Sequence, residues 1–305
     1  MKILVMGSGA VGTLFGSILL QGGQDVTLVE KRHEIVEAIQ KNGLKITRGN
    51  DEKVYNINIT NDITEVKNPD LIMFCVKSYD NITAAKDCLK VIGENTVVLT
   101  LQNGIGNYEV ISEIVGKERT LVGTTTYGST QYAPGCTRGS EVGDISIGEF
   151  HGGVSERINK LAAALTDGGF TINTVEDVNS LIWTKLAVNV AINAVGALCR
   201  IKNGKTYELE PARLVQKQAV DEVITVAKAI GITMDYEGLY EYCIKVTQTT
   251  YANNCSMLQD VEAKNPTEVL AINGAVVSEG SKVGIKTPVN EVLTNLVRAT
   301  EIGYS

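Results

Sequence analysis

The sequence is poor in the residues that build metal centres. It contains two histidines, His33 and His151, and 6 cysteines, no two of which have Cys-x-x-Cys spacing. Structural zinc sites are built from clusters of these residues, so we expect no metal site. The cysteines lie scattered in apolar or strand-like contexts. This predicts buried, free thiols and agrees with a reducing, cytoplasmic location.

The chain also lacks blocks of like charge and long uninterrupted apolar runs. Its net charge is -7 and 21% of its residues are charged, which argues against nucleic acid as a partner. Polar residues break the apolar runs well short of a membrane span, and the chain enters a strand at once. We therefore expect neither a membrane partner nor a signal peptide. A length of 305 residues is enough for two domains with separate cores.

The first thirty residues carry the pattern of a dinucleotide-binding unit. A short apolar run, Ile3–Met6, is typical of a buried strand and precedes glycines spaced G-x-G-x-x-G. An apolar helix follows, and then a second strand, Asp25–Val29, which ends in Glu30. Strand, glycine turn, helix, strand and acid in this order predict a Rossmann unit. The alternative is a glycine turn that binds nothing.

Each glycine of the turn has a predicted role. The first permits the tight turn, the second lets the backbone approach a pyrophosphate, and the third lets the helix lie close to the sheet. The pyrophosphate would lie on the amides at the helix N-terminus. The turn residues expected to bind cofactor are Gly7, Ser8, Gly9, Ala10, Val11 and Gly12.

Strands and helices alternate through the rest of the first half, which predicts a parallel, doubly wound sheet. Helices are expected at 34–41, 82–92 and 154–166, and strands at 71–76, 96–101 and 170–175. Residues 44–60 should form strands that turn at 49–51, and residues 120–150 should form antiparallel strands that complete the sheet.

Three polar residues follow strand ends of this predicted sheet. They are Glu30, Lys77 and Asn103. Ligands of parallel sheets bind outside the carboxyl ends of the strands, so we expect all three to line one crevice with the glycine turn. An ordinary surface lysine and an ordinary turn asparagine explain Lys77 and Asn103 equally well.

The composition changes near residue 178, where strand alternation stops. We expect a dinucleotide-binding domain over residues 1–178 and an all-helical substrate and dimerisation domain over 179–305. Further helices are expected over about 211–230 and from Pro288 to about 302. Ser256 is suited to a helix N-cap, and Glu268 to the first turn of a helix that starts at Pro266.

The first helix of the second half, Asn179–Cys199, is apolar nearly all round. A helix of this kind is buried. Lys185, Asn189 and Asn193 lie four residues apart and share one face. Buried polar side chains need partners, so the stripe is expected to face a substrate cleft. A solvent-facing stripe on a half-buried helix is the alternative.

Several segments together resemble the ketopantoate reductase (2-dehydropantoate 2-reductase) family over essentially the whole chain. They are GSGAVG at 7–12, VKSYD at 76–80, LQNGIG at 101–106, WTKLAVNVAIN at 183–193, SMLQD at 256–260, PTE at 266–268 and ING at 272–274. The resemblance implies an N-terminal Rossmann domain, an all-helical C-terminal domain, an active site between them and a homodimer. It also implies reduction of a branched 2-oxo acid to the (R)-2-hydroxy acid, with a place in pantothenate biosynthesis.

The resemblance also implies roles for individual residues. Lys185 would be the catalytic lysine, which donates a proton or a strong hydrogen bond to the ketone oxygen while hydride arrives at carbon. That oxygen gains negative charge, so a cation there stabilises the transition state. Glu268 would position lysine and substrate. The other implied residues are Asn189 and Asn193 for substrate oxygens, Ser256 for the carboxylate with Asn253 and Asp260 nearby, Asn103 between nicotinamide and substrate, and Lys77 on the cofactor.

Two departures from the family pattern leave the cofactor and substrate open. Family members that use NADPH often carry an arginine directly after the second strand, whereas this chain reads Glu30, Lys31, Arg32. An acid there binds a ribose diol and repels a phosphate, although Lys31 or Arg32 could still bind one. The usual arginine before PTE is replaced by Lys264-Asn265. NADPH and NADH therefore remain alternatives, as do a D-2-hydroxyacid dehydrogenase for bulky branched or aromatic 2-oxo acids and a non-catalytic dinucleotide sensor.

Overall fold

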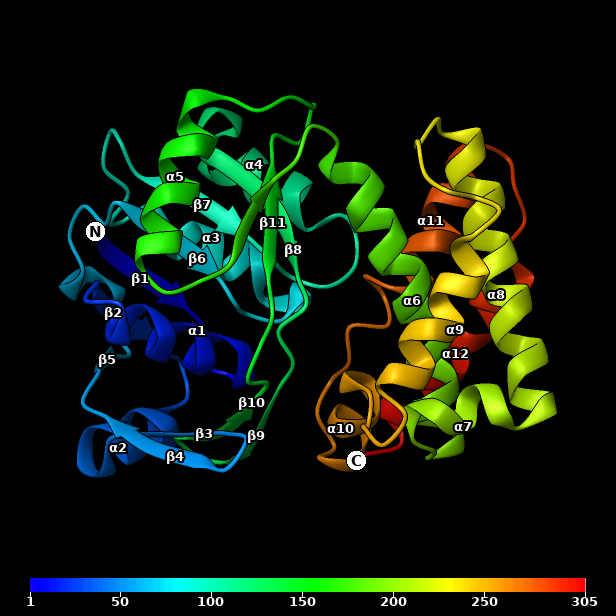
Figure 1. The fold of residues 1–305 in the computed structure, drawn as a ribbon, viewed down its shortest axis with the longest axis horizontal. Helices are drawn as coiled ribbons and strands as arrows, with labels where there is room; N and C mark the ends of the chain where they lie inside the picture. The colour runs from blue at the N-terminus through cyan, green and yellow to red at the C-terminus, as the bar shows by residue number, and fades with distance from the viewer. Residues whose placement is uncertain (305) are drawn as a thin grey trace. The chain divides into compact units, whose positions relative to one another are not determined.

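The computed structural model describes residues 1–304, which form two compact units. Unit 1 comprises residues 1–102 and 107–178. Unit 2 comprises the segment Asn103–Gly106 and the chain from Asn179 onward. Figure 1 shows the elements of each unit with their labels.

Unit 1 is built on an eight-stranded sheet in which six neighbouring strands run parallel. In spatial order the strands are β12 (Ile172–Thr174), β11 (Ile145–Gly148), β8 (Thr120–Thr125), β7 (Val97–Thr100), β6 (Leu71–Phe74), β1 (Lys2–Met6), β2 (Asp25–Val29) and β5 (Asn58–Thr60). The chain order reverses at β1, which lies between β2 and β6. In open sheets of this kind the ligand crevice lies at such a reversal, outside the carboxyl ends of the strands.

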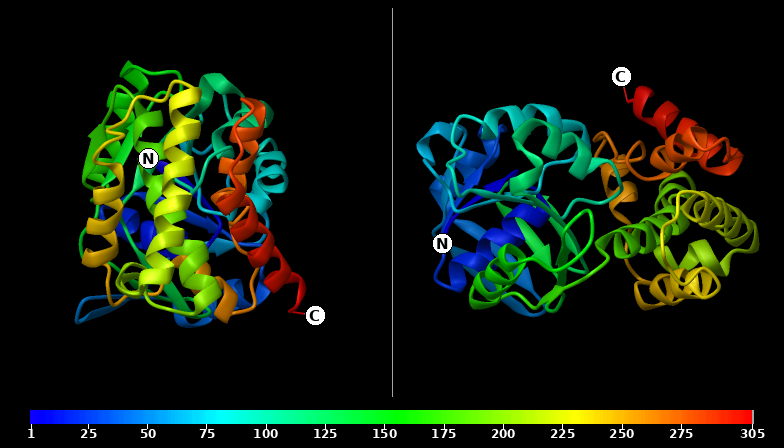
Figure 2. Two further views of the ribbon diagram at one scale, coloured as in Figure 1. Left: turned by 90° about the vertical axis from the view of Figure 1, so that its right-hand side faces the viewer. Right: turned by 90° about the horizontal axis from the view of Figure 1, so that it is seen from above.

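Helices cover both faces of this sheet, as the right-hand view of Figure 2 shows. Side chains of β1 alternate between two cores, with Val5 in one and Leu4 in the other. A strand that is apolar on both faces needs cover on both sides. One core takes α1 (Ala10–Gln21), α2 (His33–Asn42) and α5 (Glu156–Asp167), and the other takes α3 (Asn81–Cys88) and α4 (Asn107–Val115). Short 3-10 turns lie at Ile63–Glu65, Ser78–Asp80 and Lys117–Arg119.

A second, four-stranded sheet packs on α1. Its order is β4 (Asp51–Tyr55), β3 (Leu44–Arg48), β10 (Cys136–Gly139) and β9 (Ser129–Ala133). The hydroxyls of Thr13 on α1 and Thr137 on β10 lie 2.8 Å apart. The predicted antiparallel completion of the main sheet by residues 120–150 is therefore wrong in part. β8 runs parallel to β7, β11 joins the main sheet antiparallel to β8, and β9 and β10 belong to the second sheet. Strand alternation identifies a strand but does not choose its partner.

Unit 2 is helical and surrounds α6 (Val178–Cys199). Val190, Ala191 and Ala194 of this helix are fully buried. Around it lie α7 (Asn203–Glu208), α8 (Glu210–Ala229), α9 (Leu239–Thr249), α10 (Ser256–Glu262), α11 (Asn273–Lys282) and α12 (Pro288–Ile302). Their buried apolar residues form one core with those of α6.

One helix, α6, resembles a membrane span in length and mean hydropathy, although polar residues interrupt its apolar runs as the sequence predicts. Its 22 residues are long and apolar enough to cross a bilayer by length and composition. However, the helix contributes the largest share of the unit 2 core, and it carries Lys185, Asn189 and Asn193 in its length. A core helix of a globular domain meets the same criteria, and the burial of α6 identifies it as one.

Candidate functional site

The glycine turn between β1 and α1 has the geometry that close packing demands. Gly7 has a φ of +98°, and a Cβ there would lie 2.9 Å from the backbone nitrogen of Val76. At Gly12, a Cβ would lie 1.9 Å from the carbonyl oxygen of Gly7. At Gly9, in contrast, a Cβ would meet no atom within 4 Å. Packing therefore explains two of the glycines, whereas the third borders open space.

The N-terminus of α1 fits an anionic ligand. Its N-cap residue is Gly9, which has no side chain with which to cap the first-turn amides. Such amides, together with the helix dipole, bind phosphate groups. The open space beside Gly9 lies at these same amides. Residues Gly7 to Gly12 thus fit the pyrophosphate of a dinucleotide.

Glu30 is buried beside this turn and is already surrounded by donors. It is 4% exposed and accepts hydrogen bonds from the amide and hydroxyl of Ser8, both at 3.1 Å. Nε and Nη2 of Arg32 bind its two carboxylate oxygens at 2.9 and 2.8 Å. Burial alone would raise the pKa of Glu30, but the hydrogen bonds and charge of Arg32 outweigh it and lower the pKa below the usual value. Glu30 and Arg32 therefore form a charged pair.

The two other cations expected near the cofactor differ in their surroundings. Lys31 is exposed, and its Nζ binds both carboxylate oxygens of Asp80, at 2.7 and 2.8 Å. Lys77 lies three residues past the end of β6 and is half-buried. The sequence analysis missed one residue here, Gln131 on β9, whose Nε2 donates to the carbonyl oxygen of Ser8 at 3.2 Å. No local pattern could find it, because it belongs to the second sheet.

The polar stripe of α6 is buried rather than solvated. Asn193 is 4% exposed, and Lys185 and Asn189 are half-buried. The Nδ2 atoms of Asn189 and Asn193 are both buried and have no hydrogen-bond partner among the described residues. A buried amide without a partner costs about 1–3 kcal/mol. The burial of both amide nitrogens favours a stripe that faces a ligand over a solvent-facing stripe, because neither donor has an acceptor within residues 1–304.

The start of α10 lies against this part of α6. The Sγ of Cys255 donates to the backbone oxygen of Asn193 at 3.6 Å, which ties the start of α10 to α6. Cys255 is the N-cap of α10, so the prediction of Ser256 in that position is wrong by one residue. Ser256 and Asn253 are exposed, and Asp260 is half-buried.

Glu268 does not lie in the first turn of a helix. It is 7% exposed and begins a turn in which its carbonyl oxygen accepts from the amides of Ala271 and Ile272, at 3.0 and 3.1 Å. The next helix, α11, starts only at Asn273. The interpretation of Glu268 as an N-terminal helix charge is therefore wrong, and its burial needs another explanation.

The cysteines are free, but not all are buried. Burial raises the pKa of Cys75, Cys88 and Cys243 to about 12 each, and Cys255 is also buried. Cys199, at the end of α6, is exposed, so the expectation of buried thiols is wrong there. Among residues 1–304, no group of three or more His, Cys, Asp or Glu side chains could hold a metal ion.

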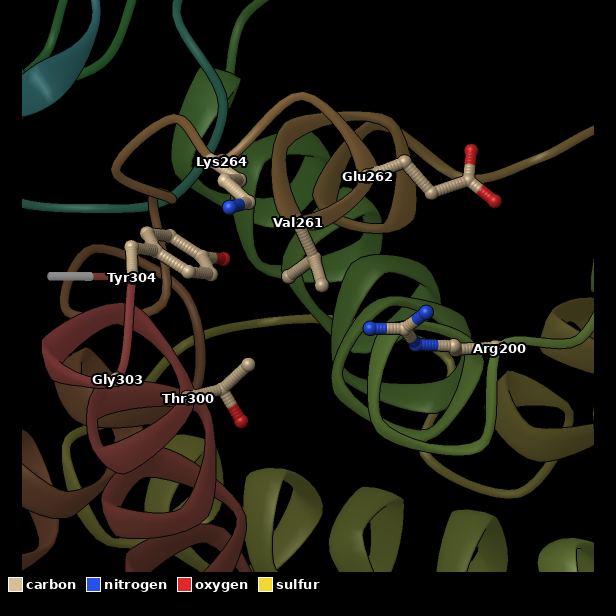
Figure 3. A pocket seen from close by; sticks show the side chains of 7 residues that line it. All are labelled: Arg200, Val261, Glu262, Lys264, Thr300, Gly303 and Tyr304. Atoms are coloured by element: carbon tan, nitrogen blue, oxygen red, sulfur yellow. The ribbon is translucent and has the colours of Figure 1, made fainter.

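A cavity of about 380 Å³ lies elsewhere in unit 2 (Figure 3). Its walls include Arg200, Lys264 and Tyr304. Arg200 is the first residue after α6 and Lys264 is the second after α10, and their φ angles are positive, 53° and 55°. Basic residues there offset the negative ends of the helix dipoles. Arg200 is about 22 Å along the helix axis from Lys185, and the walls of the cavity include neither Lys185 nor the two asparagines of the stripe.

Comparison with known proteins agrees with this architecture. The family model described as "Ketopantoate reductase PanE/ApbA" matches residues 3–152, and "Ketopantoate reductase PanE/ApbA C terminal" matches 177–301. The 2-dehydropantoate 2-reductases of Halobacterium salinarum and Archaeoglobus fulgidus are 35% and 36% identical over 302 and 304 residues. These alignments cover 99% of this chain and 99% and 98% of the relatives.

Solved structures give the same result. A PanE/ApbA family ketopantoate reductase from Ralstonia eutropha matches with a TM-score of 0.92 and 28% identity, over 99% of both chains. A D-mandelate dehydrogenase solved with NADH and anilino(oxo)acetate matches with a TM-score of 0.94 and 28% identity, again over 99% of both chains.

A Rossmann unit with an open glycine turn, followed by a helical unit that carries a half-buried lysine and two asparagines on one helix face, is typical of an oxidoreductase that uses a nicotinamide dinucleotide. Within this class, the chain belongs to the ketopantoate reductase family, because the two family models together match most of its length.

The different surroundings of Gly9 and Gly12 lead to a prediction. Gly9→Ala should change the free energy of unfolding by less than about 0.5 kcal/mol, because its Cβ meets nothing. It should nevertheless weaken nucleotide binding at least about tenfold, because the methyl group occupies the pyrophosphate path. Gly12→Ala should cost about 1–3 kcal/mol of stability through overpacking. Urea unfolding and calorimetric titration with NADPH and NADH measure both effects. Equal nucleotide affinity in Gly9→Ala and the unmodified protein would contradict the placement.

Proposed function

We propose that this protein reduces 2-dehydropantoate to (R)-pantoate with hydride from NADPH or NADH. The observation that carries the proposal is the pair of buried, unpartnered amide donors of Asn189 and Asn193 on the same helix face as Lys185. A 2-oxo acid offers the oxygen acceptors that these donors need. The ketopantoate reductase family and the names of the full-length relatives support the same substrate.

Lys185 is the proposed proton donor in this reaction. The bound nicotinamide supplies the hydride, and negative charge develops on the ketone oxygen as the hydride arrives. An ammonium group held beside that oxygen stabilises the charge and provides the proton. Half-burial of Lys185 favours this role because charge interactions strengthen when water is excluded.

The remaining site residues bind and orient the two ligands. In the proposal, Glu268 positions substrate and lysine, Asn189 and Asn193 bind substrate oxygens, and Ser256 binds the carboxylate. Glu268 is only 7% exposed, and this burial favours a side chain with a fixed orientation over a mobile, solvated one. The remaining proposed roles are as follows: Asn253 and Asp260 lie beside Ser256, Asn103 links the nicotinamide and the substrate, and Lys77 contacts the cofactor.

A relaxed choice between NADPH and NADH is part of the proposal. Glu30 alone would repel a 2′-phosphate, but Arg32 compensates its charge. The same pairing occupies the carboxylate oxygens that would otherwise bind the ribose diol. Neither cofactor is therefore strongly excluded.

A D-2-hydroxyacid dehydrogenase is the second candidate. Two structures of D-mandelate dehydrogenase with NADH match this chain at TM-scores of 0.94 and 0.92, with 28% and 27% identity. The absence of an arginine at Lys264-Asn265 also departs from the ketopantoate reductase pattern. Such an enzyme would act on bulkier 2-oxo acids at the same site.

A spectrophotometric screen separates these functions. Both reduced cofactors are tested with ketopantoate, 2-oxoisovalerate, 2-oxoisocaproate and benzoylformate, and kcat/KM is compared. We expect the highest value with ketopantoate and a ratio between the cofactors below a hundredfold. A preference for benzoylformate or 2-oxoisocaproate would support the second candidate. Nucleotide binding without turnover of any 2-oxo acid would indicate a sensor instead, and a hundredfold NADPH preference would rule out the relaxed choice.

The assigned role of Lys185 gives a further prediction. Lys185→Ala should lower kcat at least a hundredfold, because the developing oxyanion loses its cation and proton source. The dissociation constants of NADPH and NADH should stay unchanged. Lys245→Ala, an exposed lysine on α9, is the matched control and should keep normal turnover. Near-normal kcat in Lys185→Ala would show that another group protonates the product.

We also propose a cytoplasmic homodimer. Val292 and Leu296, one turn apart on α12, are 56% and 50% exposed, and Leu214 on α8 is 55% exposed. Contact with a second copy would remove this apolar surface from water. Light scattering should give twice the chain mass of 32.8 kDa, and Leu296→Glu should shift the protein towards monomer. A monomer at tens of micromolar would refute the dimer. The free thiols support the location, which cell fractionation tests.

A further inference from the structure

The segment Asn103–Gly106 leaves unit 1 after Gln102, groups with unit 2, and returns to unit 1 at Asn107. Its tip is fixed tightly within unit 2. The amide of Ile105 donates to the carbonyl oxygen of Ala271 at 3.0 Å. Gly104 has a φ of +83°, and a Cβ there would lie 2.2 Å from the same oxygen. The segment carries Asn103 as its first residue.

A buried amide joins the two ends of this segment. Nε2 of Gln102, just before the segment, donates to Oδ1 of Asn81 at 2.7 Å. Nδ2 of Asn81 donates to Oδ1 of Asn107, just after the segment, at 2.8 Å. Asn81 and Asn107 are 3% and 6% exposed. The side chain of Asn81, at the start of α3, therefore bridges Gln102 and Asn107, which are the two stems of the segment. We call these three hydrogen-bonded side chains the clasp.

The stem at Gln102 is also tied to the glycine turn. Its Nε2 donates a second hydrogen bond, to the carbonyl oxygen of Val76 at 2.6 Å, and its Oε1 accepts from the hydroxyl of Thr100 at 2.9 Å. Val76 directly precedes Lys77 and packs so closely on Gly7 that a Cβ on this glycine would lie 2.9 Å from the backbone nitrogen of Val76. Both amide hydrogens of Gln102 are thus committed, which fixes the orientation of its side chain.

We propose that Asn81 is a positioning residue for the reaction: it holds the stems of the segment Asn103–Gly106 together and so fixes where Asn103 is presented. The inference rests on the proposed function for the role of Asn103. Asn81 touches neither ligand in this scheme. It acts through the backbone of Gln102 and Asn107.

Packing alone does not explain a polar clasp in this place. α3 and α4 already meet through apolar residues of one core, among them Ala85 and Ile111, both fully buried. The contact of α3 with α4 does not itself need a polar side chain at residue 81, whereas Gln102 and Asn107 each use Asn81 as a hydrogen-bond partner. Buried, fully satisfied amide networks specify one geometry, whereas apolar contacts tolerate small shifts. The clasp thus sets geometry at the stems.

The test compares three substitutions at this position. Asn81→Ala and Asn81→Leu remove both hydrogen bonds, and Leu retains side-chain volume. Both should lower kcat about ten- to hundredfold, as small misplacements of positioning groups do. The dissociation constant of the nucleotide should change less than threefold, because Gln102 still holds Val76. Asn81→Asp should recover part of kcat, since a carboxylate accepts from Gln102 and from a rotated Asn107 amide.

Hydrogen exchange at the amide of Ile105 provides a readout that needs no turnover. Loss of the clasp should speed this exchange at least tenfold, while amides of β6 and β7 remain protected. Ser112→Ala, which removes a buried hydroxyl on α4, is the matched control and should change neither. If Asn81→Ala and Asn81→Leu do not fold, Asn107→Ala, which removes the acceptor of the Asn81 amide, carries the same comparison.

The outcomes separate this inference from the proposed function. Unchanged Ile105 exchange in the variants would overturn the clasp, whatever the substrate is. Faster exchange with normal kcat would overturn the positioning role. Equal losses in kcat and in nucleotide affinity would indicate general disruption of unit 1, and would also overturn it. Failure of the substrate screen would leave the exchange result standing.

Discussion

The close approach of the backbone at Gly12 determines how α1 packs on the main sheet of unit 1. A side chain at Gly12 would collide with the carbonyl group of Gly7, so α1 lies as close to β1 as a backbone can. The second sheet packs on α1 from the other side, and through Gln131 it also holds the carbonyl of Ser8. Ser8 in turn holds Glu30. Residues of both sheets therefore fix the geometry of the glycine turn. The space beside Gly9 is the part of the turn that protein atoms leave open.

Buried amides play two different parts in this protein. In unit 1, Gln102 and Asn81 have their donors satisfied by neighbouring oxygens, so they maintain a shape. In unit 2, the Nδ2 atoms of Asn189 and Asn193 are buried without partners, which costs stability in the protein alone. An unsatisfied donor gains its hydrogen bond only when a ligand supplies the acceptor. Side-chain amides thus maintain a shape in unit 1, whereas in unit 2 they are the proposed binding groups, and their hydrogen-bond partners distinguish the two cases.

The sequence was informative where local pattern determines structure. The span of β2 and the limits of α12, from Pro288 to Ile302, follow directly from apolar runs and helix-start residues. The partners of β9 and β10, the end of α3 at Cys88 and the turn at Glu268 did not follow, because each depends on distant residues. For the site, spacing placed Lys185, Asn189 and Asn193 on one face of α6. It could not show that the amides lack partners, nor that the two stems of Asn103–Gly106 meet at Asn81.

Glu30 shows why a motif residue needs its neighbours for interpretation. An acid after the second strand is typical of a ribose ligand, and its charge should repel a 2′-phosphate. Here the carboxylate already accepts five hydrogen bonds from Ser8 and Arg32, which equals or exceeds the lone pairs it has to offer. Its charge is compensated by a guanidinium group that remains 43% exposed at the edge of the same turn. The preference for a cofactor must therefore be argued from the pair of Glu30 and Arg32, because the charge and the hydrogen bonds of each depend on the other.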